Sequence, residues 1–144
     1  MKKLLILMVA VMMSSLTFAQ RVQEQDVPVI VRTTIKEKFP QTNAQNTTWE
    51  KDKEHYRAVY RDRDNDQYVK IRSNGRIMEI KEKVNEDVLP ANMRNYVENN
   101  YSGHRIKEVH KTTDENGNVT YHTEVKGKNL IFDRNGNYLR EEKK

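Results

Sequence analysis

The sequence predicts an α+β fold, in which two tandem α-β-β-β-β repeats place their helices on one face of an antiparallel sheet of about eight strands. The first observation is Gln67–Ile80, where two stretches of alternating apolar and polar residues flank Asn74-Gly75. Asn-Gly in this setting is a strong hairpin signal, because both residues tolerate the positive φ of a type I′ turn. The second is the return of this unit 61 residues later, at Lys128–Glu141 with its turn at Asn135-Gly136. The third is a pair of helical patterns, described below.

The first 19 residues have the three parts of a secretory signal peptide. Two lysines form a positive start, Leu4–Met13 is apolar, and a more polar segment ends with small residues at Thr17 and Ala19. We therefore expect cleavage after Ala19 and a periplasmic or secreted protein with no membrane contact afterwards. The apolar segment is too short to cross a hydrocarbon core of about 30 Å comfortably. No cysteine is present for lipid attachment.

The mature chain, residues 20–144, is long enough for one compact domain or two very small units. Without the two signal-peptide lysines, 24 of the 26 lysines and arginines remain against 21 acidic residues, a net charge of +3. No basic stripe of the kind that follows a nucleic acid is evident, so we expect no nucleic acid partner. The absence of cysteine excludes disulfides and thiol chemistry and favours a bacterial envelope or secreted protein.

A helix is predicted over about residues 28–39, near the start of the first repeat, residues 20–84. Its apolar residues are spaced i, i+4, i+8 and i+12, on one stripe of an amphipathic helix: Val27, Val31, Ile35 and Phe39. Asp26 is the expected N-cap, and Pro28 suits the first turn. Gln20–Asp26 is polar and is expected to be a flexible lead-in.

The second repeat, residues 85–144, begins with the same pattern after a joint at Lys81–Val88. The apolar stripe returns 62 residues on, and Pro90 corresponds to Pro28: Leu89, Met93, Val97 and Tyr101. We therefore predict a second helix over about residues 90–101.

Four strands should follow each helix. They are predicted at Thr48–Lys51, His55–Arg61 and the first hairpin, then at Ile106–Thr112, Val119–Val125 and the second hairpin. A meander covered by one helix buries one face only. The inward candidates are Trp49, Tyr56, Ala58, Tyr60, Val69, Ile71, Met78 and Ile80, then Val109, Tyr121, Val125, Leu130, Phe132 and Leu139. Joining the two sheets edge to edge would protect their edges.

No catalytic constellation is evident. The mature chain has only two serines, Ser73 and Ser102, and turn chemistry explains both. Carboxylates are numerous but lie among lysines and arginines, without an apolar pocket to raise a pKa. We therefore predict a protein that is not an enzyme and that has no cofactor.

Two histidines, His110 and His122, lie on adjacent predicted strands. A three-residue loop at Asn116–Asn118 would make them diagonal neighbours on one face, whereas a two-residue loop would place them on opposite faces. Pairing Val109 with Val125 favours the three-residue loop.

Glu124 would then lie beside both histidines, and two histidines with a glutamate can bind zinc. Solvated polar residues on an exposed sheet face are the stronger interpretation. We therefore predict no metal, with His110, His122 and Glu124 as the weak candidate site.

An acidic loop offers a second metal pattern. Asp62, Asp64 and Asp66 have the spacing of an EF-hand start, but Gln67 stands where glycine is needed and Ser73 where glutamate is needed. We interpret this segment as an acidic hairpin loop.

Several short features occur together: the signal peptide, the helix openings Val27-Pro28 and Leu89-Pro90, Lys38–Pro40, Trp49-Glu50 and the Asn-Gly turns. Over Asp26–Glu142 the chain resembles the PepSY-like family of β-lactamase-inhibitor-like proteins, exported proteins of Bacteroidetes-type bacteria. The resemblance implies a tandem α+β fold similar to that of β-lactamase inhibitor protein. It also implies a periplasmic or secreted location and binding or inhibition of another protein, and it supplies no catalytic residues.

The face of the sheet away from the helices is the candidate binding surface. It mixes arginine, tyrosine and apolar residues, a composition typical of protein-binding surfaces: Arg57, Val59, Tyr68, Lys70 and Arg72. An ordinary solvated face is the alternative, since strand propensity alone also favours such residues.

Our hypothesis is an exported, monomeric, non-enzymatic module that binds a protein partner through this face. Its most specific form is an inhibitor of an envelope or secreted enzyme, a protease or a β-lactamase. A small-ligand or metal-binding module that uses His110, His122 and Glu124 is one alternative. A structural envelope protein without a specific partner is another.

Overall fold

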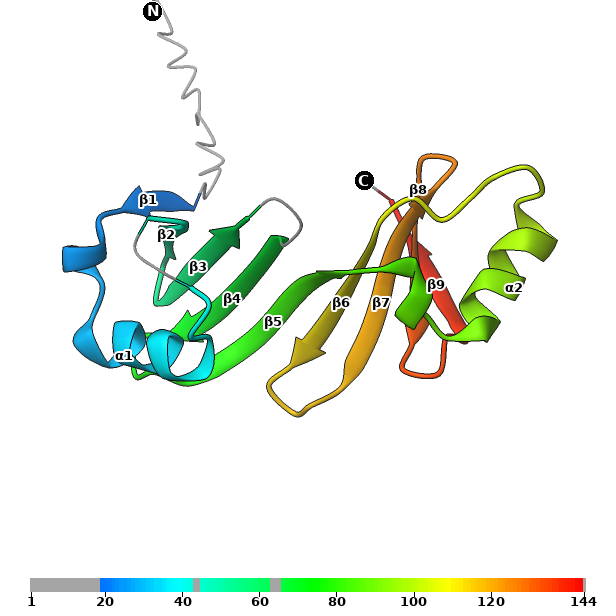
Figure 1. Ribbon diagram of the computed structural model, residues 1–144. Helices are drawn as coiled ribbons and strands as arrows, with labels where there is room; N and C mark the ends of the chain where they lie inside the picture. The colour runs from blue at the N-terminus through cyan, green and yellow to red at the C-terminus, as the bar shows by residue number, and fades with distance from the viewer. Residues whose placement is uncertain (1–18, 43–44, 63–65, 144) are drawn as a thin grey trace, which may run out of the picture.

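The structure, a computed structural model, describes residues 19–42, 45–62 and 66–143. Over these residues the chain forms one antiparallel sheet of nine strands in sequential order, so the predicted α+β fold with tandem repeats is confirmed. The elements are β1 (Gln20–Val22), α1 (Val29–Lys38), β2 (Thr47–Asp52), β3 (His55–Arg61), β4 (Asp66–Arg72), β5 (Ile77–Val84), α2 (Ala91–Asn100), β6 (Val109–Asp114), β7 (Val119–Val125), β8 (Lys128–Asp133) and β9 (Tyr138–Glu142). Figure 1 shows α1 beside the first half of this sheet and α2 beside the second. Asp64 of the acidic loop lies outside the described residues.

Both helices lie within one residue of their predicted bounds, and each begins directly after a proline. Pro28 and Pro90 stand at the N-cap positions. The prediction that Asp26 caps α1 is wrong, because Asp26 closes a short 3-10 helix, Glu24–Asp26, followed by the extended backbone of Val27. The fixed φ of proline favours the start of a helix without a side-chain cap.

The prediction that Gln20–Asp26 is a flexible lead-in is also wrong. Gln20–Val22 forms the edge strand β1, in which Val22 stands opposite Trp49 of β2. Val22 packs against the first hydrophobic core. The polar composition conceals this strand, since its pairing comes from the backbone and only one inward side chain needs to be apolar.

Each helix covers its own hydrophobic core. Val31 and Ile35 of α1 pack with residues of β2, β3 and β4: Trp49, Tyr56, Ala58, Val69 and Ile71. Met93 and Val97 of α2 pack with the second set: Ile106, Val109, Val125, Leu130 and Phe132. Both cores lie on one face of the sheet, because Ile80 of the first half stands opposite Thr113, which shares a face of β6 with Val109.

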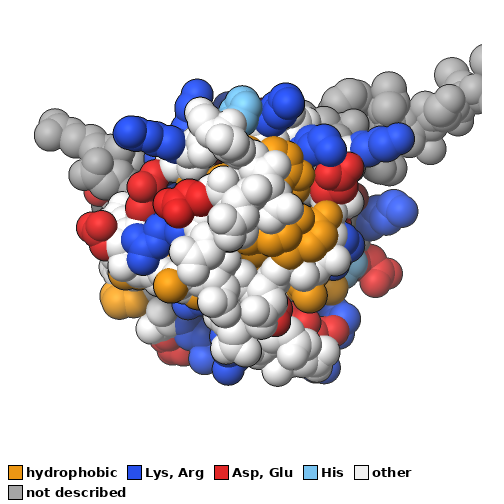
Figure 2. Space-filling model, turned by 90° about the vertical axis from the view of Figure 1, so that its right-hand side faces the viewer, with side chains coloured by type: hydrophobic (Ala, Val, Ile, Leu, Met, Phe, Trp, Pro, Cys, Tyr) orange, Lys and Arg blue, Asp and Glu red, His pale blue; other side chains and the backbone are white. Residues whose placement is uncertain are grey.

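Tyrosines border the second core. The rings of Tyr96 and Tyr138 stack with centroids 4.5 Å apart, and Phe132 meets Tyr96 edge-on at 5.5 Å. Figure 2, which views the molecule from the side of α2, shows hydrophobic side chains reaching the surface among charged ones. Such aromatic contacts add packing at the edge of a core that has few apolar residues.

The hairpins at Asn74-Gly75 and Asn135-Gly136 have three-residue loops instead of the predicted type I′ turns, and the hairpin at Asn116-Gly117 has a three-residue loop as well. In loops 73–75, 115–117 and 134–136, the glycine N–H donates to the carbonyl three residues before it. Each glycine has a positive φ of 81° to 85° and each asparagine does not. This is a type I turn followed by a left-handed glycine, the G1 bulge.

The loop geometry explains why the inward prediction for Met78 is wrong. Ile71 stands opposite Ile77, but Lys70 stands opposite Glu79. Met78 is thus the extra residue of a β-bulge, and Ile77 packs against the first core in its place. The prediction assumed a two-residue loop, which would set Met78 and not Ile77 opposite Ile71.

The second hairpin repeats this arrangement, so the inward prediction for Leu139 is wrong for the same reason. Phe132 stands opposite Tyr138, while Ile131 stands opposite Arg140. Tyr138 packs against the second core, and Leu139 is 48% exposed.

Strand β5 is longer than predicted and joins the two halves. Residues 81–84, assigned above to the joint, continue the strand and pair with β6, from Lys81 opposite Thr112 to Val84 opposite Val109. Ile77 and Ile80 pack against the first core, whereas Val84 packs against the second. One strand therefore serves both cores.

The close fit of the second Asn-Gly turn under α2 gives a stability prediction. A Cβ at Gly136 would lie 2.6 Å from the Pro90 Cβ and 3.0 Å from the Met93 nitrogen. Gly136→Ala should therefore lower the free energy of unfolding by about 3 kcal/mol, since the left-handed conformation costs roughly 1–2 kcal/mol and the overlap adds to it. Gly117→Ala, with the same φ and no atom within 4 Å, should cost only the roughly 1–2 kcal/mol of the left-handed conformation. Equal losses in urea unfolding would contradict this packing.

Two turn carboxylates give a pH prediction. The backbone and side-chain N–H groups of Asn118 and Asn137 donate to Asp114 and Asp133, and these bonds lower the pKa of both carboxyls. Their stabilisation is present above the unfolded pKa of about 3.9 and is lost as pH falls through the folded pKa. The double variant Asp114→Asn/Asp133→Asn should lose less thermal stability than the parent between about pH 4.5 and pH 2.5. An unchanged pH dependence would show that these bonds do not favour the ionised form.

Candidate functional site

Both α1 and α2 lie on one face of the sheet, and we call the opposite face, which neither helix covers in the described residues, the open face. It carries the side chains that alternate with the buried ones along the strands. The five residues predicted to bind a partner all lie on it: Arg57, Val59, Tyr68, Lys70 and Arg72. The register sets Arg57 opposite Lys70 and Val59 opposite Tyr68.

Arg57 and Tyr68 belong to a cluster that crosses four strands. The Arg57 guanidinium carbon lies 5.1 Å from the centroid of the Tyr68 ring, and its Nη1 lies 3.3 Å from Glu50 Oε2. The Tyr68 hydroxyl donates to the Glu79 carboxylate. Burial, together with that carboxylate, holds the pKa of Tyr68 well above its usual range. Both side chains are thus oriented by neighbours before any partner arrives.

A hollow of about 200 Å³ lies beside this cluster. The structure brings three of the predicted residues together there, Arg57, Val59 and Tyr68, and adds residues of β5 and β6. Its lining is Glu50, Arg57, Val59, Arg61, Asp66, Tyr68, Lys81 and His110.

Arg72 lies apart from this hollow. Its Nη2 is 3.7 Å from Glu115 Oε2 in the loop between β6 and β7, and Arg76 shares the same carboxylate at 3.3 Å. Arg72 therefore connects the first hairpin to the second half of the sheet.

His110 and His122 share the open face, but as direct cross-strand partners and not as diagonal neighbours. The predicted pairing of Val109 with Val125 is wrong, since Val109 stands opposite Thr123. The loop spans residues 115–117, one residue earlier than predicted, because Gly117 occupies its left-handed third position.

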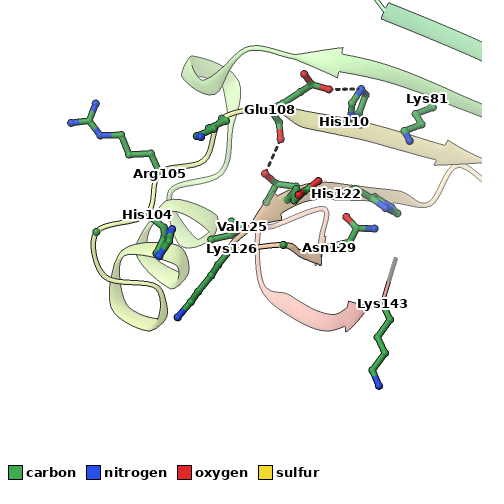
Figure 3. Close-up of a pocket in the computed structure, with 15 residues that line it drawn as sticks. Lys81, His104, Arg105, Glu108, His110, His122, Val125, Lys126, Asn129 and Lys143 are labelled. Carbon is green, nitrogen blue, oxygen red and sulfur yellow. Dashed lines mark hydrogen bonds and ion pairs between the residues drawn. The ribbon is translucent and has the colours of Figure 1, made fainter.

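The two histidines line a cleft of about 980 Å³, which we call the basic cleft (Figure 3). One wall is the segment 103–108 between α2 and β6, and the other is the turn between β7 and β8. Its charged residues are Lys81, Arg105, Lys107, Glu108, Glu124, Lys126 and Lys143. Lys81 and His110 line both this cleft and the smaller hollow.

The histidines are held in hydrogen-bonding distance of neighbours. His122 Nε2 lies 2.9 Å from Thr120 Oγ1, and His110 Nε2 lies 3.4 Å from Glu108 Oε1. Burial, and then the positive charge of Lys81, lower the pKa of both imidazoles. Both rings therefore take up a proton less readily than an exposed imidazole does.

The candidate metal triad does not converge. Glu124 is exposed and stands opposite Asn129 on β8. Within residues 19–42, 45–62 and 66–143, no three side chains of His, Asp or Glu form a group that could hold a metal ion.

Sequence reasoning missed the cations of the basic cleft: Lys81, Arg105, Lys107, Lys126 and Lys143. Lys81 was assigned to the joint, and the others lie in irregular segments, at a turn or near the C-terminus. If β5 is continued through residues 81–84, strand alternation places Lys81 on the open face. No local sequence pattern indicates that the other four cations lie near one another.

Two helix-and-meander units that share one sheet define a protein of the PepSY-like, β-lactamase-inhibitor-like class. The chain belongs to this family, described as "Putative beta-lactamase-inhibitor-like, PepSY-like", which matches residues 16–79 and 54–140. The resemblance noted in the sequence is therefore confirmed. No curated protein sequence matches the chain. No helix in the described part of the chain is long and apolar enough to cross a membrane.

Solved structures share the fold. A protein from Bacteroides eggerthii with the description "putative periplasmic proteins" is 18% identical with a TM-score of 0.69, over 81% of this chain and 88% of its own. A DUF2874 family protein from Bacteroides uniformis is 18% identical with a TM-score of 0.67, over 80% and 88%. A BLIP-like protein from Bacteroides fragilis is 19% identical with a TM-score of 0.59, over 78% and 83%. At these identities the likeness shows the fold.

The environment of the histidines can be tested by NMR titration. Lys81→Gln should raise the pKa of both His110 and His122, because it removes a positive charge that disfavours the imidazolium. Glu108→Gln should lower the pKa of His110, since Glu108 favours its charged form. Lys38→Gln, on α1, is the control and should change neither. Unchanged values in Lys81→Gln would contradict this arrangement.

Proposed function

We propose that this chain is an exported, non-enzymatic protein-binding module that holds its partner against the open face. The observation that carries the proposal is the cluster of Arg57 and Tyr68, oriented by Glu50 and Glu79 beside a hollow. Arginine and tyrosine are the residue types that most often dominate the energy of protein interfaces.

Pre-orientation is what distinguishes this cluster from an ordinary solvated face. A long side chain loses rotamer freedom on binding, at a cost of about 0.5–1.5 kcal/mol. Arg57 is already placed by the Tyr68 ring and the Glu50 carboxylate, so much of this cost is met in the free protein. The hollow beside it could receive one side chain of the partner.

Export rests on the signal-peptide pattern of residues 1–19. The description of the Bacteroides eggerthii protein as periplasmic supports it. With the signal peptide removed, the partner would be met in the periplasm or outside the cell.

In its most specific form, the partner is an envelope or secreted enzyme of the protease or β-lactamase class, which the chain inhibits. The family description and the BLIP-like neighbour support this form. The module itself would need no chemistry, since an inhibitor of this kind acts by covering a surface. Both serines of the mature chain, Ser73 and Ser102, are exposed turn residues.

Affinity capture with variants tests the proposal. The chain from Gln20 would be immobilised and exposed to envelope extract of its own organism, and a partner retained in stoichiometric amount would be identified by mass spectrometry. Tyr68→Ala and Arg57→Ala should each weaken that complex by about 30-fold or more, equivalent to about 2 kcal/mol.

The matched control is Arg94→Ala, on α2 and away from the open face, which should leave the affinity unchanged. No partner above a scrambled-surface control, or a partner that all three variants bind equally, would remove the proposal. Inhibition of the captured enzyme in a turnover assay would separate the inhibitor from a simple binding protein.

A further inference from the structure

The basic cleft differs from the rest of the open face in its charge balance. Its five cations are Lys81, Arg105, Lys107, Lys126 and Lys143, and its two carboxylates are Glu108 and Glu124. None of the five cations forms an ion pair with another residue that the structure describes. Elsewhere on the open face, by contrast, Arg57, Arg72 and Lys83 pair with glutamates.

A concave surface concentrates such an excess. Field lines from unpaired charges are focused in a hollow with protein walls, which raises the local concentration of ions of opposite sign. The carboxylate of Glu108 does not compensate the excess fully, because it lies 3.6 Å from Lys83 Nζ and 3.4 Å from His110 Nε2. The cleft therefore favours an anionic occupant.

The wall that carries Arg105 and Lys107 is fixed to the sheet. Ile106, between them, is buried in the second core. Thr123 is 2% exposed, and its Oγ1 donates to the Glu108 carbonyl at 2.7 Å. Ile106 and Thr123 thus hold the irregular segment 103–108 in place, and the cleft is a built feature of the second half.

The opposite wall keeps a lysine in an unfavourable backbone conformation. Lys126 has a φ of +52° and is followed by Gly127 at +73°, in the two-residue turn between Val125 and Lys128. Asparagine or glycine adopts this conformation more readily than lysine. Lys126 therefore places a positive charge at the rim of the basic cleft, at a position where the turn conformation alone would favour asparagine.

The spread of the cations indicates the kind of anion. In Figure 3, Lys81, Arg105, Lys126 and Lys143 extend from different sides of the cleft in different directions. A compact anion such as phosphate is usually bound by convergent donors and paired arginines. The cleft also lies at the upper end of the roughly 300–1,000 Å³ range of small-molecule sites. The separated cations of the cleft are therefore better suited to an extended ligand with several carboxylates than to one compact anion.

We infer that the basic cleft receives an acidic segment of the protein partner in extended conformation, whose Asp and Glu carboxylates meet the cations at its rim. This inference rests on the proposed function and adds the chemistry of the partner. The Arg57 and Tyr68 cluster would hold one part of the partner, and the basic cleft would hold its acidic segment.

Binding of such a segment should strengthen as pH falls. The groups that face the two histidines are Glu79, Lys81 and Lys83 of β5, Glu108, Asp66 of β4, Thr120 of β7, and Arg140 and Glu142 of β9. Lys81 acts on both rings and disfavours their protonation. A ligand carboxylate placed there would favour the imidazolium, so the complex takes up protons and its affinity rises at lower pH.

The test uses the chain from Gln20 and a short fluorescent peptide of alternating Glu and Ser, with a Gln-for-Glu peptide as its matched control. The acidic peptide should bind at least about tenfold more tightly than the control peptide. Lys81→Gln and Lys126→Asn should each weaken its binding by about three- to tenfold. Lys38→Gln, which changes a lysine on the helix side, should not. NMR shifts should map to residues 104–108 and 122–127.

Loss of folding cannot imitate this result, because Lys126→Asn should unfold at the same urea concentration as the parent or at a higher one. Affinity for the acidic peptide should rise by about threefold or more between about pH 7.5 and pH 6, and His110→Gln/His122→Gln should abolish that rise. Equal binding of the two peptides, or an equal effect of Lys38→Gln, would overturn the inference. Displacement of the peptide by inorganic phosphate at matched ionic strength would overturn it in favour of a compact-anion site.

The two proposals can fail separately. If capture of a partner depends on Tyr68 but the chain shows no preference for the acidic peptide, only the inference about the acidic segment is removed. If the acidic peptide binds as expected but no captured partner depends on Tyr68 or Arg57, the proposed role of the Arg57 and Tyr68 cluster is removed.

Discussion

The pairing of β5 with β6 is the interaction on which the rest of the structure depends. It runs from Glu79 opposite Asp114 to Val84 opposite Val109, and β5 supplies apolar residues to both cores. Each half alone would have one helix, a core of only eight or nine buried residues and an additional free sheet edge. Small units bury a smaller fraction of their surface, and unpaired edges invite association. The pairing of β5 with β6 joins the two small cores into one domain and removes one free sheet edge from each half.

The same ladder builds the candidate site. Lys81 lies on β5, opposite Thr112 of β6, and lines both the small hollow and the basic cleft. Two surfaces that belong to different repeats thus become neighbours only because the sheets are continuous. A partner that covers the open face would meet Arg57 and Tyr68 on one side of Lys81, and the basic cleft on the other.

The two repeats share an architecture but present different chemistry. In the first, Arg57 of the open face pairs with Glu50, and Tyr68 donates a hydrogen bond to Glu79. In the second, His110 and His122 line a cleft whose five cations, with Lys81 of β5 among them, form no ion pair with another described residue. Repetition constrains the inward residues, which must fill a core under a helix, and leaves the outward residues free to differ.

The sequence by itself determined the fold class, both helices and the hairpins, because these follow from local periodicity and from Gly and Pro at particular positions. It also placed Arg57, Val59 and Tyr68 on one face, since strand alternation is local. It failed at Met78 and Leu139, because a three-residue loop and a β-bulge beyond it change the pairing in a way that composition does not reveal. Only the tertiary structure decided that Lys81, the segment 103–108 and the turn at Lys126 surround one cleft. Their proximity arises from the pairing of strands distant in sequence, and no local pattern encodes it.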